Sequence, residues 1–226
     1  MPKTVHVIGN GDSAMFYNEA PRKGLKLACN LPPFPIENLY ASCMVDFKMM
    51  RHIHKGDVDV PGEWILGARP KAYMEKNSQF HMQRSHQIKM FYTRLPSYAA
   101  NYTDLNCGHM AVYFAAQHLK AERIHMYGFD SIFDFNLRSF TDTFINSDRG
   151  GMNNNRLTNN WRPLWQNIFK DFGDGRCEFV IHHMHDNLKF KIGDNVTIEK
   201  YGRRDEITEQ EGKSGEAWVP PASGIM

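Results

Sequence analysis

The chain has 226 residues, of which 42% are hydrophobic and 23% are charged, and its formal net charge is +2. These values are typical of a soluble globular protein with a sizeable core, and so small a net charge does not indicate nucleic-acid binding. The longest apolar run is too short to cross a bilayer, and the four cysteines lack the paired spacing of a zinc site or a disulfide framework. We therefore expect a cytoplasmic protein with no membrane span and no signal peptide.

The first predicted element is a β-branched strand over residues 4–8 that ends in the turn Gly9-Asn10-Gly11. The two glycines allow a ligand to approach the main chain closely. Asp12 or Ser13 can cap a following helix, whose free N–H groups would favour a phosphate. The pattern predicts a nucleotide-binding strand–turn–helix unit, and a tight turn without a ligand is the alternative. It is not a dinucleotide fingerprint, because Met15 replaces the third glycine.

Two further strands are predicted over residues 24–30 and 39–46, and the second of them leads into a helix that extends to residue 54. The first three strands therefore end at Asn10, Asn30 and Asp46. In open α/β sheets ligands bind beyond the carboxyl ends of the strands, so we expect these polar side chains to line one crevice.

Strands and helices continue to alternate along the rest of the chain. Strands are expected at residues 64–68, 88–92, 123–130 and 176–183, and helices at 70–76, 110–120 and 161–172. This order predicts an α/β fold with a Rossmann-like, mostly parallel sheet and helices on both faces. We expect one domain over residues 1–201 and a polar tail over 202–226. Residues 131–160 lack periodicity and predict a polar lid before the last long helix.

Two more polar turns belong to the same predicted crevice. The turn Asn106-Cys107-Gly108 stands at a helix start, and Gly128-Phe129-Asp130 ends a strand. A thiol at a helix start can become a nucleophile, although close packing is the simpler role for Cys107. Arg156, in the predicted lid, has a guanidinium fork that matches the oxygens of a diphosphate.

The order of these turns resembles that of the bacterial single-domain sialyltransferases and the related motility accessory factors. The resemblance covers residues 4–134 in short islands: Gly9-Asn10-Gly11 with Ser13, Cys29-Asn30, the 106–108 turn and Gly128-Phe129-Asp130. It implies a nucleotide-sugar donor that is bound without a required metal. Asn10 and Asn30 would hydrogen-bond the donor, and the 106–108 turn would face its phosphate or sugar.

The chain departs from this family at three places. Asp12 stands where the family has proline, and Asp46 falls near its third donor-contacting asparagine. Residues 155–161 contain no histidine, although the family's catalytic histidine lies in that region. A transferase needs a group that takes the proton of the acceptor hydroxyl, so another residue must act as base or the reaction must differ.

A histidine-rich stretch stands at the end of the last predicted strand: His182-His183-Met184-His185-Asp186. His183 and His185 would share one face of that strand, while His182 points the other way. Either of the two could be a general base oriented by Asp186, or part of a metal site. For these histidines, a polar strand end without a catalytic role is the simpler alternative. In the transferase hypothesis, Asp130 would orient a hydroxyl group or the lid.

The favoured hypothesis is a glycosyltransferase that uses a nucleotide-sugar and needs no further cofactor, with an unknown acceptor. One alternative is a non-catalytic nucleotide-binding or accessory module on the same fold. The other is a Mg²⁺-dependent phosphoryl or diphosphoryl transferase, for which Asp57-Val58-Asp59 could hold the cation. A divalent metal is not favoured, and the oligomeric state stays open.

Overall fold

The computed structural model describes residues 3–19, 22–99, 105–133, 162–185 and 192–201. Eight parallel strands form one sheet in the order β5-β4-β3-β2-β1-β6-β7-β8. They are β1 (Thr4–Ile8), β2 (Leu25–Cys29), β3 (Ala41–Met44), β4 (Trp64–Leu66), β5 (Ile88–Phe91), β6 (Arg123–Tyr127), β7 (Glu178–His183) and β8 (Val196–Lys200). The predicted α/β, Rossmann-like fold is confirmed.

The helices connect consecutive strands. They are η1 (Asp12–Glu19), α1 (Phe47–Lys55), α2 (Ala68–Lys76), α3 (Ser78–Arg84), η2 (Ser85–Gln87), α4 (Cys107–Tyr113), η3 (Phe114–His118), η4 (Asp130–Ile132) and α6 (Arg162–Asp171). Four described elements were not predicted: α3, η2, η4 and β8. The short helices η2 and η4 span three residues each. α3 and β8 each have a single buried side chain, Phe80 and Val196 respectively, so their apolar pattern is weak. Within the described ranges, no helix combines the length and the apolar character that a membrane span requires.

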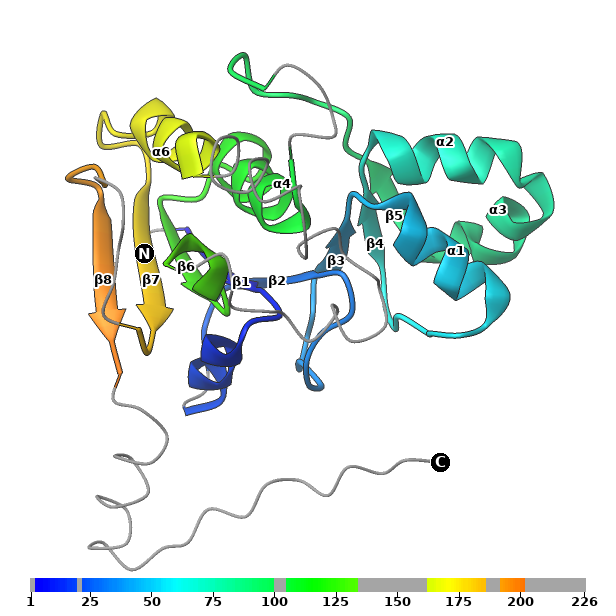
Figure 1. Ribbon diagram of the computed structural model, residues 1–226, viewed down its shortest axis with the longest axis horizontal. Coiled ribbons are helices and arrows are strands. Elements are labelled where there is room, and N and C mark those ends of the chain that lie inside the picture. Colours follow the sequence, from blue (N-terminus) through cyan, green and yellow to red (C-terminus); the bar gives the residue numbers. More distant parts are fainter. Residues whose placement is uncertain (1–2, 20–21, 100–104, 134–161, 186–191, 202–226) are drawn as a thin grey trace, which may run out of the picture.

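Helices cover both faces of the sheet, as predicted. α4 and α6 lie over one face, where they pack against side chains such as Val7, Ile124 and Phe179. On the opposite face, η1 covers Ile8 and Tyr127, and α1 packs against the strands near β5 (Figure 1). Because helices cover both faces of the sheet, the side chains on both faces of its strands are buried, and this explains why the strands are rich in apolar residues.

The sheet changes its direction of winding at β1. The chain proceeds from β1 through β2 to β5 on one side, and then crosses to β6, which pairs with β1 and continues through β7 to β8. The carboxyl ends of β1 and β6 therefore flank a topological switch point, the place where open α/β sheets bind ligands. Asn10 follows β1, and Asp130 follows β6.

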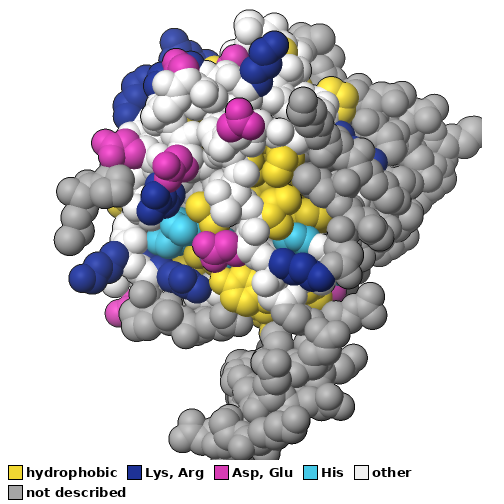
Figure 2. Space-filling model, turned by 90° about the vertical axis from the view of Figure 1, so that its left-hand side faces the viewer, with side chains coloured by type: hydrophobic (Ala, Val, Ile, Leu, Met, Phe, Trp, Pro, Cys, Tyr) yellow, Lys and Arg dark blue, Asp and Glu magenta, His cyan; other side chains and the backbone are white. Residues whose placement is uncertain are grey.

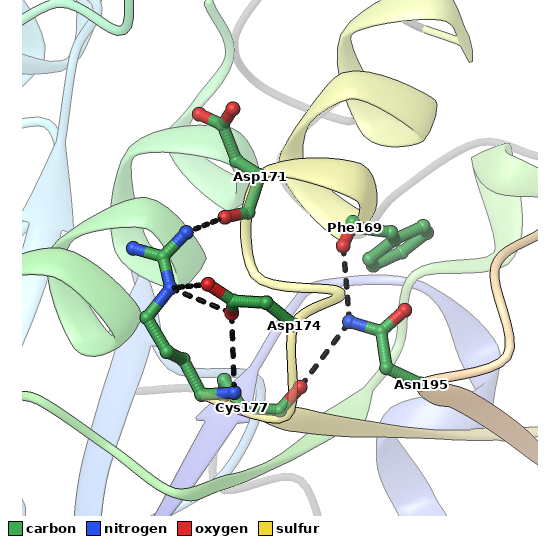
Figure 3. Close-up of polar contacts among 6 residues, drawn as sticks. Phe169, Asp171, Asp174, Cys177 and Asn195 are labelled. Atoms are coloured by element: carbon green, nitrogen blue, oxygen red, sulfur yellow. Dashed lines mark hydrogen bonds and ion pairs between the residues drawn. The ribbon is translucent and has the colours of Figure 1, made fainter.

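Hydrogen bonds join the edge strand β8 to its neighbours at the amino ends of the strands, away from the switch point. Asn195, just before β8, donates from Nδ2 to the carbonyl oxygens of Phe169 and Cys177, at 3.0 and 3.2 Å (Figure 3). Asp174 accepts from the Arg176 guanidinium in the same turn. These contacts join the end of α6 to the segments that lead into β7 and β8.

Three histidines form a row across β1, β6 and β7, on the sheet face that η1 partly covers. The rings of His6 and His125 stack at 5.0 Å, and His125 Nδ1 lies 2.9 Å from His182 Nε2. His182 Nδ1 lies 3.0 Å from the Tyr201 hydroxyl. On the β8 side of the molecule, Figure 2 shows histidine side chains between acidic and basic groups. We call His6, His125 and His182 the histidine row.

Burial, and then the positive charges nearby, favour the neutral form of the histidine row. Burial, with a neighbouring histidine as the next cause, lowers the pKa of His125 to about 4 and that of His182 to about 3. Burial also lowers the pKa of His6. The positive charges nearby are Arg22, Lys26 and Arg123, and Glu199 is the acidic neighbour, with Oε2 3.2 Å from His182 Nδ1. Because a single proton bridges His125 and His182, both rings cannot be charged without separating.

We predict that acid destabilises the fold through this row. The folded-state pKa values lie below the unfolded value of about 6.5, so the unfolded chain binds more protons below that pH. The free energy of unfolding should be highest above pH 6.5. It should fall as the pH drops towards 4, by at most roughly 1.4 kcal/mol per pH unit for each histidine. Urea unfolding between pH 7.5 and 4 measures this slope.

A matched pair of variants assigns the slope to its source. His182→Gln should reduce the fall in the free energy of unfolding between pH 6.5 and 4. His86→Gln, which changes an exposed histidine of η2, should leave that fall unchanged. An equal slope in wild type and His182→Gln would show that the histidine row does not control acid stability.

Candidate functional site

The turn after β1 lies directly against the turn after β6. The Gly9 N–H donates to the Tyr127 carbonyl at 2.7 Å, and the Gly11 N–H donates to the Gly128 carbonyl at 3.0 Å. A Cβ on Gly9 would lie 2.6 Å from Gly128 O, so a larger residue does not fit there. The glycines are thus required by a contact within the protein, and their approach to a ligand stays a prediction.

The Asp130 carboxylate joins the ends of three strands. It is 2% exposed, and it accepts hydrogen bonds from the Ser13 N–H at 3.1 Å and from the Ser13 hydroxyl. Its Oδ1 lies 2.9 Å from His185 Nε2, beyond the end of β7. The Met184 N–H, also beyond β7, donates to Ser13 Oγ at 3.3 Å. A buried carboxylate needs such donors, because an unpaired buried charge is strongly unfavourable.

This arrangement corrects one expectation. The sequence predicted free N–H groups at the start of η1 for a phosphate, but the Ser13 N–H already binds the Asp130 carboxylate. An internal anion occupies the place that a phosphate was expected to take. Asp12 is exposed at the same helix start.

The two candidate bases differ in their surroundings. The His183 ring is 3% exposed and stacks on Phe133 at 3.6 Å, and its Nδ1 accepts the His185 N–H at 2.8 Å. The His185 side chain is 27% exposed and pairs with Asp130. A ligand can therefore reach His185 far more readily than His183. Asp186, the predicted orienting group, lies outside the described residues, and Asp130 is the carboxylate that His185 contacts.

The asparagines after β1 and β2 lie at the same edge of the sheet. Asn10 is buried and donates from Nδ2 to the Leu31 carbonyl at 2.5 Å. Asn30 has a positive φ of 57°, and its Oδ1 accepts from the Cys107 thiol at 2.9 Å. No hydrogen bond joins the Asn30 amide nitrogen to another described residue. The structure thus brings Asn10, Asn30 and Cys107 together, as the sequence predicted.

Asp46 and Asn106 cap the two helices that start at this edge. Asp46 Oδ1 accepts from the Lys48 N–H at 2.9 Å, at the start of α1. Asn106 Oδ1 accepts from the His109 N–H at 2.8 Å, and His109 Nδ1 accepts the Asn106 N–H at 3.2 Å, which completes a capping box. A Cβ on Gly108 would lie 2.7 Å from Phe129, so this glycine packs α4 against the end of β6. The predicted contacts of Asp46, Asn106 and Gly108 with a nucleotide-sugar donor stay predictions.

Cys107 is a thiol at neutral pH. Burial raises its pKa to about 12, although the Val45 N–H, which donates to Sγ at 3.3 Å, acts in the opposite direction. Since the thiolate is the nucleophile, this environment does not activate Cys107. The simpler sequence interpretation, that it supports close packing, agrees with its 6% exposure.

Arg69 is a site residue that the sequence reasoning missed. It lies in the first turn of α2, and its Nε donates to the Val45 carbonyl at 3.1 Å, at the end of β3. Its positive charge acts to lower the pKa of Cys107, which places the guanidinium near the edge that carries Asn30. The signal was present, because Arg69 directly follows the predicted strand 64–68, much as Asp46 and Asp130 end their predicted strands. The predicted helix, however, began only at Pro70.

Other predicted groups lie elsewhere. Asp57 Oδ2 pairs with His52 at 2.9 Å, and Asp59 Oδ1 pairs with Arg84 at 3.3 Å, after the end of α1. α1 leads away from the carboxyl edge, so the structure does not bring this acidic triplet to the site. Among the side chains that the structure describes, no three His, Cys, Asp or Glu are placed to hold a metal ion. Arg156 and most of the predicted lid fall outside the described residues.

Comparison with known proteins gives no match to a family model, to a curated protein or to a solved structure.

We predict that Gly11→Ala disrupts the contact between the β1 and β6 turns. The new Cβ would lie 2.0 Å from Asp130 Oδ2, so the buried carboxylate must move away from Ser13. We expect a loss of about 1–3 kcal/mol or more in the free energy of unfolding, measured in urea. Gly173→Ala is the control, because its Cβ would meet nothing closer than 3.3 Å. Equal stability of the two variants would contradict this packing.

Proposed function

We propose that the protein transfers a sugar from a nucleotide-sugar donor to an acceptor hydroxyl, at the carboxyl edge of the sheet. The observation that carries the proposal is the meeting of His185 with Asp130 and Ser13 at the topological switch point. Asn10, Asn30 and Arg69 lie at the ends of neighbouring strands and helices on the same edge. This edge therefore combines amide groups, a guanidinium and an imidazole–carboxylate pair.

The donor side consists of Asn30 and Arg69. The Asn30 amide oxygen already binds the Cys107 thiol, so the Asn30 amide nitrogen is the group that would donate a hydrogen bond to an oxygen of the nucleotide-sugar. The Arg69 guanidinium keeps further N–H groups beyond the one that holds Val45 O, and these match phosphate oxygens. Such a cation stabilises the negative charge that develops on the leaving phosphate.

The acceptor side consists of His185 and Asp130. His185 Nε2 lies 2.9 Å from Asp130 Oδ1. With the ring proton on Nε2, the lone pair stands on Nδ1, and this nitrogen takes the proton of the acceptor hydroxyl. The acceptor oxygen forms a bond to the anomeric carbon, and the bond from that carbon to the phosphate oxygen breaks. The nucleotide leaves with the electron pair, and the proton remains on His185.

Donor binding is tested by thermal shift with CMP-, UDP- and GDP-sugars, each with and without chelator. We expect one nucleotide class to stabilise the fold, by about 2.7 kcal/mol at 100 times its Kd. Arg69→Ala should weaken this binding at least tenfold. Arg123→Ala, an exposed cation at the amino end of β6, should not. No shift with any nucleotide-sugar contradicts the donor site, and loss of the shift with chelator favours the Mg²⁺-dependent alternative.

The base is tested separately, by turnover of the donor that binds. His185→Ala should lower kcat by about 10²–10⁴-fold and leave donor affinity unchanged. His86→Ala, an exposed histidine on η2, is the matched control and should keep full activity. Binding without turnover in the wild-type protein supports the non-catalytic module, and an unaffected kcat in His185→Ala excludes this residue as the base.

A further inference from the structure

A cavity of about 620 Å³ begins at Leu31, just after β2, and has no role in the proposed chemistry. Its walls are residues 31–36 and Leu39 of the β2–β3 connection, together with Pro61 and Gly62 before β4. This volume is within the range of small-molecule sites, about 300–1,000 Å³.

The lining favours apolar ligands over polar or charged ones. None of its nine residues has a side-chain nitrogen or oxygen, and four of them are prolines, which lack a backbone N–H. A phosphate, carboxylate or sugar hydroxyl that entered would lose its hydrogen bonds with water and gain few in return. A hydrocarbon gains about 25 cal/mol for each Å² that it buries. The chemistry of the walls therefore selects an uncharged apolar ligand.

The cavity is held open by packing behind its walls. Phe34 stacks on Tyr17 of η1 with ring centroids 6.1 Å apart, and Ile36 packs against the same cluster. Leu31 packs against the core cluster that contains Met44 and Trp64. Fixed proline φ angles add to this rigidity, so little conformational entropy is lost when a ligand enters.

The cavity and the candidate site share the Asn30–Leu31 peptide. Asn30 contacts Cys107 at the strand ends, and Leu31 lines the cavity. The Asn10 side chain holds the Leu31 carbonyl, so the β1 turn fixes the first wall residue. Leu31 thus places one end of the cavity next to the strand end that carries Asn30.

We propose that this cavity binds the hydrocarbon chain of the acceptor, a chain of the acyl or prenyl type. The identification of the ligand as the acceptor rests on the proposed function. Binding of a hydrocarbon chain to the cavity does not depend on that function, so the two can be tested apart.

The experiment measures Nile red fluorescence with the full chain, in the absence of any nucleotide. We expect saturable binding that decanol displaces and that glucose at the same concentration does not. Leu39→Asp places a charge in the cavity and should weaken displacement by decanol at least tenfold. Met82→Asp removes a 72% exposed apolar side chain on α3, outside the cavity, and should leave displacement unchanged.

Pro35→Glu provides a second test at an exposed wall residue, in case Leu39→Asp unfolds the chain. The proposal is overturned if decanol does not compete, or if folded cavity variants bind it as tightly as wild type. If cavity-dependent decanol binding is seen but no nucleotide-sugar binds, the proposed transferase fails and the hydrocarbon site stands. If donors bind and turn over while decanol does not compete, the hydrocarbon site fails alone.

Discussion

The carboxylate of Asp130 is the group on which the rest of the candidate site depends. It follows β6, is almost completely buried, and binds Ser13 at the start of η1 and His185 beyond β7. Three segments that are far apart in sequence therefore meet at one charge. Because a buried carboxylate is stable only with such donors, their positions are coupled to one another.

Close contact between the first two turns follows from the same constraint. Ser13 can reach Asp130 only if the β1 turn lies against the β6 turn, and Gly9, Gly11 and Gly128 leave no room for side chains between them. The Gly-Asn-Gly sequence thus has a structural cause at this position. A donor-binding role for Asn10 adds to that cause and does not replace it.

Much of the site was predictable because the signals are local. Strand periodicity and polar turn residues placed Asn10, Asn30, Asp46, Asn106 and Asp130 at strand or helix ends, and a parallel sheet brings these ends to one edge. The side-chain partners were not predictable, because the bonded pairs are distant in sequence. Ser13 and Asp130 are 117 residues apart, and so the internal carboxylate at the start of η1 could not be foreseen. His185 likewise pairs with Asp130, whereas the sequence suggested the adjacent Asp186.

The central claim is that Asp130 and Ser13 act as one coupled unit at the switch point. A double-mutant cycle with Ser13→Ala, Asp130→Asn and the double variant, measured by urea unfolding, tests it directly. Coupling predicts an interaction energy of about 1 kcal/mol or more, because Ser13→Ala removes the hydroxyl hydrogen bond and Asp130→Asn removes the charge that strengthens the same bond. Free-energy changes that add to within about 0.5 kcal/mol would contradict it, since independent sites behave in that way.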